Sequence, residues 1–491
     1  MTVHLSILLA LPAVGGLVGA VAGGRAARWP ALLGSFLALA YSIVAIVRFK
    51  SGGGLQFVTD QDWISALGVH FKVGLDGLNI LLVLLTTVTF SATTLWAALR
   101  EDYERPGLFF FWFGLTQSAV LLALTAQDLL LFVLAFDLML VPVLFLTGIW
   151  GGPERVRAIT KLFIYTLVGS LLMLAAAIAT AVMSQGDSTL SFAFSDLAVR
   201  IPETLGSGTQ DWIFLFFAAA FLVKMPAFPL QGWMPDGYGN MPLPVLAVFS
   251  GVLSKVAAYG FIRVLLPLFP DAAQHFQTLF LLLALASILY GSAMAFTTTQ
   301  TRLVLGYSSI AQLGFIVLGI FSLRNEGVQG ALLQSVNHGL VVVPAFFVVA
   351  LLSARAGGSE DLRDMGGIAF RAPVLAALFL VVALATLAMP GSSNFAGEFL
   401  ILLGVFKAKV TIAILASFGV AMASVYSLRL FIRTVHNRVG PKVQSRELSV
   451  ADGLVLVPLI LAILALALYP QFGLSRSEAS VKRAVSAGVV K

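Results

Sequence analysis

The sequence predicts an all-α polytopic membrane protein with about fourteen transmembrane helices. Hydrophobic residues make up 59% of the 491 residues, charged residues make up only 11%, and long apolar runs recur along the chain. Soluble domains contain about 25% charged residues, whereas each helix that spans a bilayer needs about 20 mostly apolar residues. The chain therefore carries more apolar surface than a soluble core can bury.

Charged residues and glycine- or proline-rich breaks separate the apolar runs and set the expected limits of the spans. These limits are 3–21, 30–49, 75–98, 107–125, 127–149, 160–183, 211–231, 241–264, 276–299, 302–322, 329–353, 372–392, 394–431 in two pieces, and 452–470. Near 385–410 a second division is possible, with one broken helix over 372–406 and a span over 410–434. The first span has no basic segment before it, so we expect it to remain in the mature protein. The longest extramembrane pieces are 51–74, 184–210 and 435–451.

The distribution of lysine and arginine predicts the orientation of the chain. Loops after odd-numbered spans hold 15 of these residues, the other loops hold 8, and the C-terminal tail holds 4. Because basic loops stay in the cytoplasm, we expect both termini on the outer side. The net charge of +7 thus reflects topology and gives no sign of nucleic-acid binding. With no cysteine, the chain cannot supply thiolate ligands to a metal or iron–sulfur cluster.

Six ionisable residues interrupt apolar runs at membrane depth. They are Asp137, Lys224, Lys255, His338, Glu398 and Arg429. A charge at mid-membrane costs about 2.5–3.5 kcal/mol, so we expect pairing, hydration or both, and a role in ion translocation. The alternative for the carboxylates and lysines is a static salt bridge that fixes helix packing. For the histidine it is a hydrogen bond across helices, and the arginine lies near a helix end where it can reach the interface.

Two of these charges lie beside breaks in their apolar runs. MPAFP follows Lys224 directly, and AMPGSSNF precedes Glu398 by a few residues. Proline removes a helical hydrogen bond, and the freed carbonyl needs another partner. An interval of 174 residues separates Lys224 from Glu398 and also Lys255 from Arg429. Broken helices at corresponding places in two halves of a chain point to an ion site.

At these residues the sequence resembles the antiporter-like subunits of respiratory complex I, and specifically the M-type subunit. The matching segments are GLDGLNILLVLLT at 74–86, LMLVPVLFLTGIWGG at 138–152, KLFIYTLVGSLLML at 161–174, VKMPAFPLQGWMPD at 223–236, GVLSKVAAYGFIR at 251–263, GYSSIAQLGFIVLGIF at 306–321, NHGL at 337–340 and FAGEFLILLGVF at 395–406. The order and spacing of these segments, taken together, make the resemblance specific.

The resemblance implies fourteen helices, two inverted five-helix repeats and discontinuous helices. The implied parts are N-terminal spans over 1–106, a first antiporter-like repeat over 107–264, a second repeat over 276–434, and a C-terminal span and tail over 435–491.

The resemblance also implies that five residues translocate protons. Asp137 stands where the family has a glutamate beside the first-repeat lysine, and Lys224 matches that lysine. Lys255 matches a bridging lysine, His338 a histidine of the central hydrophilic axis, and Glu398 the glutamate that distinguishes the M-type from its lysine-bearing sister subunits.

Four positions depart from the family pattern. Asp137 is one methylene shorter than glutamate, so we expect a longer contact with its lysine or an intervening water. Gln231, Tyr238 and Gln312 stand where many family members have histidine. The proton path of this chain is therefore expected to depend more on water than on imidazoles.

The implied function is that of a proton-translocating membrane subunit of a complex I-type NADH:quinone oxidoreductase. A buried lysine keeps its proton beside a carboxylate and releases it more easily when the carboxylate withdraws. The chain is expected to bind no cofactor, with NADH, FMN, iron–sulfur clusters and quinone bound in partner subunits. The expected surroundings are L-type and N-type antiporter-like subunits in a bacterial inner membrane.

Three alternatives stay open at this point. The chain could be a subunit of an Mrp-type Na⁺/H⁺ antiporter, which shares the expected fold, or a membrane subunit of an energy-converting hydrogenase. It could also be a structural scaffold whose charges do not titrate. GLDGLNILLVLLT and the LTGIWGG loop favour complex I, and a lysine beside a helix break argues against a scaffold.

Overall fold

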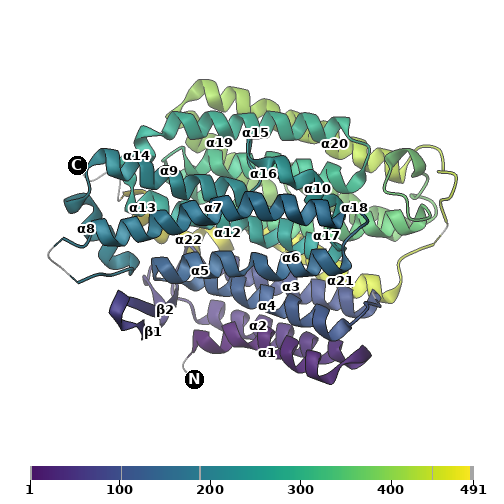
Figure 1. The fold of residues 1–491 in the computed structure, drawn as a ribbon. Helices are drawn as coiled ribbons and strands as arrows, with labels where there is room; N and C mark the ends of the chain where they lie inside the picture. Colours follow the sequence, from purple (N-terminus) through teal and green to yellow (C-terminus); the bar gives the residue numbers. More distant parts are fainter. Residues whose placement is uncertain (1–2, 101, 187–188, 445, 487–491) are drawn as a thin grey trace.

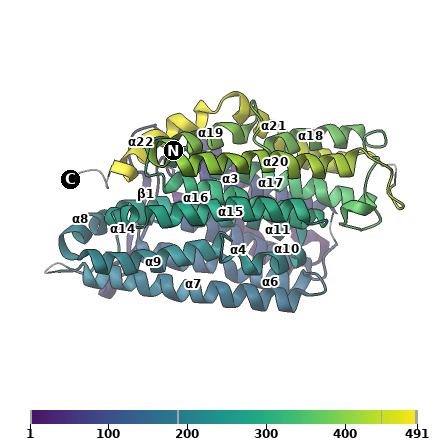
Figure 2. The same cartoon turned by 90° about the horizontal axis from the view of Figure 1, so that it is seen from above.

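The computed structural model describes residues 3–100, 102–186, 189–444 and 446–486. Figures 1 and 2 show one bundle of helices that run mostly side by side, with a small β-hairpin at one end. A backbone in hydrocarbon must satisfy its N–H and C=O groups internally, which explains why apolar runs form helices. Twelve described helices are long and apolar enough to cross a membrane. The predicted fold class is confirmed, whereas the number of fourteen spans and the repeat boundaries stay predictions.

The helices follow one another with short connections. Those of the first half are α1 (Leu5–Ala22), α2 (Arg28–Arg48), α3 (Ile80–Arg100), α4 (Pro106–Thr125), α5 (Leu129–Leu138), α6 (Leu140–Trp150), α7 (Arg155–Met183), α8 (Phe194–Thr204), α9 (Ser207–Lys224), α10 (Met234–Asn240), α11 (Leu243–Val248), α12 (Ser254–Gly260) and α13 (Leu266–Leu268). Those of the second half are α14 (Pro270–His275), α15 (Gln277–Thr297), α16 (Thr301–Ile320), α17 (Asn325–Arg355), α18 (Pro373–Thr386), α19 (Ser393–Ala408), α20 (Val410–Val435), α21 (Val450–Leu468) and α22 (Gln471–Ser486).

Two apolar helices are interrupted where the sequence places proline. α9 ends at Lys224 and α10 begins at Met234, with Pro226 and Pro229 between them. α18 and α19 are separated by residues 387–392, which include Pro390. α20 follows as a separate helix, so the division into a broken helix over 372–406 and a span over 410–434 describes this region.

A β-hairpin occupies the segment 51–74, for which the sequence predicted only an extramembrane position. β1 (Gln56–Ile64) and β2 (Val69–Leu75) pair antiparallel. α1 contacts β1, and the Ser480 hydroxyl of α22 accepts a hydrogen bond from Gly77 N just after β2. The first and last described helices therefore meet the hairpin at the same end of the bundle (Figure 1).

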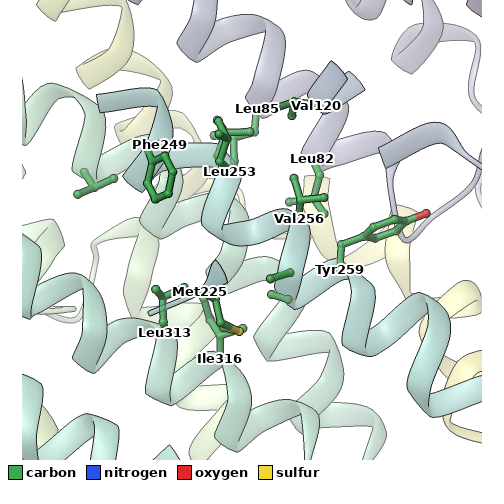
Figure 3. Packing of buried hydrophobic residues seen from close by; sticks show 14 of the residues in the cluster. Leu82, Leu85, Val120, Met225, Phe249, Leu253, Val256, Tyr259, Leu313 and Ile316 are labelled. Atoms are coloured by element: carbon green, nitrogen blue, oxygen red, sulfur yellow. The ribbon is translucent and has the colours of Figure 1, made fainter. Parts of the chain in front are cut away.

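The segment from α11 to α13 passes through the middle of the bundle and is almost entirely buried. Figure 3 shows Phe249, Leu253 and Val256 of this segment among apolar side chains from neighbouring helices. Two π-helical turns, Phe249–Leu253 and Phe261–Leu265, lie on either side of α12. Such turns are frequent at functional sites, and α12 carries Lys255.

Candidate functional site

Lys224 is the last residue of α9, and its ammonium group is buried against the end of α5. Lys224 Nζ lies 2.6 Å from Asp137 Oδ1 and donates to the Phe136 carbonyl at 2.7 Å. It also lies 3.8 Å from the centroid of the Phe136 ring. The carboxyl end of a helix favours a cation, so the break after Lys224 itself stabilises the ammonium. The shorter aspartate reaches Lys224 directly, and the longer contact expected for this pair does not occur.

The two partners of this ion pair differ in their exposure. The Lys224 side chain is 2% exposed, whereas the Asp137 side chain is 33% exposed. Ser170 of α7 donates to Asp137 Oδ1 at 2.5 Å. The carboxylate therefore lies at the outer surface of this chain between α5 and α7, with its lysine behind it.

Lys255 lies on α12, buried and without a carboxylate partner. Its Nζ donates to the Ser250 carbonyl in the preceding π-helical turn and to Ser254 Oγ, the latter at 3.2 Å. These two contacts, a carbonyl and a hydroxyl, are the polar contacts of Lys255 among the described residues, and neither is a carboxylate. A static salt bridge therefore does not account for this lysine.

His338 lies midway along α17, buried, with Lys255 as its charged neighbour. Its Nδ1 has no hydrogen-bond partner among the described residues. The neighbouring Asn337 donates to the Ser393 carbonyl at 2.6 Å and so ties α17 to the start of α19. Among the described residues, Asn337 forms a hydrogen bond across helices here, whereas Nδ1 of His338 does not.

Glu398 lies in the second turn of α19, after the break, and is buried. Its Oε1 accepts a long hydrogen bond of 3.4 Å from Gln334 Nε2, which also donates to Gln312 Oε1 at 2.7 Å. No cation among the described residues pairs with Glu398. A purely structural ion pair is therefore excluded for this carboxylate within the described part of the chain.

The close approach of α17 and α19 brings Glu398 to the glutamine pair. A Cβ on Gly330 would lie 2.7 Å from Ile401 N, and one on Gly397 would lie 3.0 Å from Gln334 Cα. Small residues allow helix backbones to approach in this way in membranes. The two glycines therefore determine the distance between the helices that carry His338 and Glu398.

Several buried polar atoms around this region have no hydrogen-bond partner in the described structure. They are Gln312 Nε2, Gln334 Oε1, Asn337 Oδ1, His338 Nδ1, Ser393 Oγ, both side-chain polar atoms of Asn394, and Glu398 Oε2. Folded proteins rarely leave buried polar groups unpaired, and ordered water is a common partner. The region between α16, α17 and α19 is therefore polar enough to hold water.

The structure places Ser250 and Ser309, which the sequence analysis did not single out, beside Tyr238, which it did. Ser250 Oγ lies 3.1 Å from Ser309 Oγ of α16, both fully buried. The Tyr238 hydroxyl faces Ser250 and is buried, with no close hydrogen-bond partner among the described residues. The cluster of Gln334, Asn337 and His338 was visible because, together with Ser335, these residues make four of the five positions 334–338 polar within an apolar run. The serines carry no such signal, because single serines are common in membrane helices.

The guanidinium of Arg429 contacts backbone and ring atoms near the end of α15. Its Nη1 donates to the Thr298 carbonyl at 3.0 Å, and its guanidinium lies 5.5 Å from the centroid of the Phe296 ring. Thr298 lies in the connection between α15 and α16, so this arginine binds the end of a helix rather than a titratable group.

Known proteins share the sequence of the region that holds this site. The protein-family model described as "NADH:quinone oxidoreductase/Mrp antiporter, TM" matches residues 126–423, which is more than half of the chain. The chain belongs to this family. A Rhodobacter capsulatus family member named NADH-quinone oxidoreductase subunit M is 34% identical over 481 residues, which cover 95% of this chain and 93% of the relative.

Solved structures extend the comparison with the family. A chain of respiratory complex I from Thermus thermophilus matches with a TM-score of 0.88 and 30% identity, covering 99% of this chain and 100% of that one. A chain of the Mrp complex from Dietzia sp. DQ12-45-1b matches with a TM-score of 0.85 and 20% identity, covering 99% of this chain and 52% of that one. The second match shows a shared fold only. The resemblance to the M-type subunit inferred from the motifs is confirmed.

Proposed function

We propose that this chain is the M-type proton-translocating membrane subunit of a complex I-type NADH:quinone oxidoreductase. The similarity to a relative named NADH-quinone oxidoreductase subunit M, over nearly the full length of both chains, supports this function. The structural match to a complex I chain at 30% identity supports it further. The family model covers Mrp antiporters as well, but the match to the Mrp chain is only 20% identical and shows a shared fold, whereas the relative named subunit M matches over nearly the full length of both chains.

One observation carries the mechanistic part of the proposal. The chain buries Lys224 in an ion pair, and it buries Lys255 and Glu398 without a counter-ion among the described residues. Unpaired ionisable groups are costly in a membrane and occur mainly on ion pathways. We assign proton translocation to Asp137, Lys224, Lys255, His338 and Glu398.

The Asp137–Lys224 pair acts as the switch. Because the carboxylate lies at the outer surface of this chain, a conformational change in a neighbouring subunit can draw it away from Lys224. The lysine then holds its proton less tightly, since a buried ammonium without a carboxylate is disfavoured. The proton passes toward Lys255 and His338 and then, through water held by Gln312, Gln334 and Asn394, toward Glu398.

Tyr238, Ser250 and Ser309 place a second branch of hydroxyls near Lys255, whose Nζ contacts the Ser250 carbonyl and the Ser254 hydroxyl. Arg302 donates to the Tyr238 carbonyl and pairs with Glu360, a partly exposed residue of the loop after α17. The backbone of Tyr238 is therefore linked to this loop through Arg302. Hydroxyls donate and accept at once, so this branch can supply Lys255 with protons where the family has histidine at position 238.

Redox chemistry belongs to other subunits in this proposal. NADH, FMN, iron–sulfur clusters and quinone bind in partner subunits, and the energy arrives through L-type and N-type neighbours. The complex lies in a bacterial inner membrane with the termini of this chain on the outer side, as the distribution of 15 basic residues in odd-span loops favours.

The proposal is tested with Lys255→Ala in the intact complex, reconstituted into vesicles. We expect quinone reduction to lose its coupled proton uptake, while the amount of assembled complex stays at the wild-type level. Lys407→Ala is the matched control, because Lys407 is 49% exposed and pairs with Glu326 at the surface. Normal pumping by assembled Lys255→Ala complex would contradict the proposal.

A further inference from the structure

A hollow of about 530 Å³ opens beside the carboxyl end of α20, and it takes no part in the proposed proton path. Its polar wall consists of Arg363, Arg433, Asn437 and Arg438. These residues belong to the loop after α17 and to the end of α20 with the loop that follows, at the right-hand end of α20 in Figure 2. Three guanidinium groups thus line one depression on the side of the bundle opposite the hairpin.

The backbone around the hollow is held in place by direct contacts between the two loops. Gly367 N donates to the His436 carbonyl at 2.6 Å, and Ala369 N donates to the Val435 carbonyl at 2.9 Å. The loops also approach so closely that a Cβ on Gly366 would lie 2.2 Å from the Arg438 carbonyl oxygen. The arginines therefore project from a fixed platform, which lowers the entropy lost on binding.

The charges around the hollow are unbalanced. Arg433 and Arg438 form no ion pair with a described residue, whereas Arg363 Nη2 lies 2.7 Å from Asp361 Oδ2. The hydrogen bond from Arg363 lowers the pKa of Asp361 to about 2, so this carboxylate stays ionised and pairs with Arg363. Asp364, next to Arg363 in the chain, also interacts electrostatically with Arg363. Two uncompensated guanidinium groups remain to bind an anion. The excess of basic residues in cytoplasmic loops explains why Arg433 and Arg438 lie on this side of the bundle. It does not explain why both line the same hollow.

The apolar wall of the hollow indicates what kind of anion fits. Leu362, Met365 and Ile432 form this wall, and Ile432 is 44% exposed near the end of the apolar helix α20. Phe370, on the same loop as Arg363, is 97% exposed. A site with guanidinium groups on one side and an apolar wall leading to a membrane-spanning helix suits an amphipathic anion, whereas a free anion needs only the guanidinium groups.

We propose that this hollow binds the phosphate headgroup of an anionic phospholipid of the cytoplasmic leaflet, with the acyl chains along α20. Arg433 and Arg438 hold the phosphate oxygens, for which the planar guanidinium is well suited. Basic pockets on the cytoplasmic side of membrane helices are known to hold anionic headgroups. The site is independent of the proton relay, and it depends on the proposed orientation only for the leaflet that it contacts.

The test uses the intact complex, delipidated in detergent and titrated with phosphatidylglycerol, with phosphatidylcholine and with inorganic phosphate. Bound lipid is counted by mass spectrometry of the isolated complex. We expect one tightly held phosphatidylglycerol in the wild type. The double variant Arg433→Gln/Arg438→Gln and the triple variant Arg363→Gln/Arg433→Gln/Arg438→Gln should both bind it about thirtyfold more weakly, from about 1 kcal/mol for each of the two unpaired arginines. The control Arg25→Gln/Arg105→Gln/Arg157→Gln removes the same charge from exposed positions on the same side and should leave binding unchanged.

Three outcomes would overturn the proposal. Equal loss in both triple variants would mean diffuse attraction, and equal binding of phosphatidylcholine would mean that charge is irrelevant. Inorganic phosphate that binds as tightly as the lipid would indicate a site for a soluble anion. The single variant Arg438→Gln changes only an exposed loop residue, so it should fold normally even if the triple variant does not. It should weaken phosphatidylglycerol binding about fivefold.

Discussion

Replacing Glu398 by glutamine separates a proton-binding role from a packing role. The side chain keeps its size and can still accept a hydrogen bond from Gln334, but it no longer binds and releases a proton. In the proposed path Glu398 is the last protonatable residue, so the loss of this group should stop translocation without preventing assembly.

The structure sets the expected effect on stability. Glu398 accepts one long hydrogen bond of 3.4 Å, its Oε2 has no partner, and no described cation pairs with it. The variant therefore loses at most about 0.5–1.5 kcal/mol, the usual net value of one hydrogen bond. Breaking a buried ion pair would cost about 3–5 kcal/mol, because it leaves a charge unpaired. We expect wild-type amounts of complex and a loss of pumping of about a hundredfold, as for a removed acid–base group.

The assay measures quinone reduction, proton uptake into vesicles and complex content in the same preparation. Glu398→Lys is included because sister subunits carry lysine at this place, and we expect it to restore part of the pumping. Glu326→Gln serves as the control, because Glu326 is a partly exposed acid that pairs with Lys407 at the membrane surface.

Two results would refute the reasoning about Glu398. Assembled Glu398→Gln complex that pumps at the wild-type rate would exclude a relay role. Alternatively, the amount of assembled Glu398→Gln complex could fall as far as expected for a broken ion pair. That result would show that Glu398 has a cationic partner and a packing role.

Lys224→Ala should abolish pumping and preserve complex content, because the Asp137 left behind lies at the surface of this chain rather than in its core and keeps the hydrogen bond from Ser170; normal pumping would contradict this. Asp137→Asn should reduce complex content, since it strands a buried ammonium at a cost of about 3–5 kcal/mol, while Asp137→Glu should be mild. Equal damage in pumping and content from both would mean that geometry matters more than charge. Tyr238→Phe should slow pumping several-fold at constant content, and Tyr238→His should restore it; unchanged pumping in the phenylalanine variant would exclude the hydroxyl branch. Gly330→Ala should lower the thermal midpoint of the complex, because the added Cβ meets Ile401 N at 2.7 Å and overpacking costs about 1–3 kcal/mol. An unchanged midpoint would show that α17 and α19 can separate freely.

Much of the architecture was predictable because it depends on local properties of the sequence. Apolar runs predicted the membrane helices, and the prolines after Lys224 and before Glu398 predicted both interruptions. The segment 51–74 was recognised as extramembrane, but its β-hairpin was missed, as was α22 in the C-terminal tail. Residues 69–73 alternate apolar and polar side chains as a strand does, so the hairpin had a signal in the sequence that the count of apolar runs passed over.

The ionisable residues of the site were predictable from the sequence, but their pairing was not. A charged residue in an apolar run is visible by itself, and the motifs gave each of the five a position in the family pattern. The sequence suggested a static salt bridge as an alternative for Lys224, Lys255 and Glu398 alike, and the structure gives an ion pair to Lys224 only. The sequence likewise could not indicate that Asp137 lies at the surface of the chain, with its carboxylate 2.6 Å from the ammonium group of Lys224.

The sequence by itself determined which segments enter the membrane, where they break and which ionisable residues they carry. Only the tertiary structure decided which of these residues face one another, which have no counter-ion, and where unpaired amides gather around Glu398. The physical reason lies in the solvent. A helix in water reveals its buried face as an apolar stripe, but lipid is as apolar as a protein core. The rotation of each helix, and with it the direction of every polar side chain, is therefore set by packing against its neighbours.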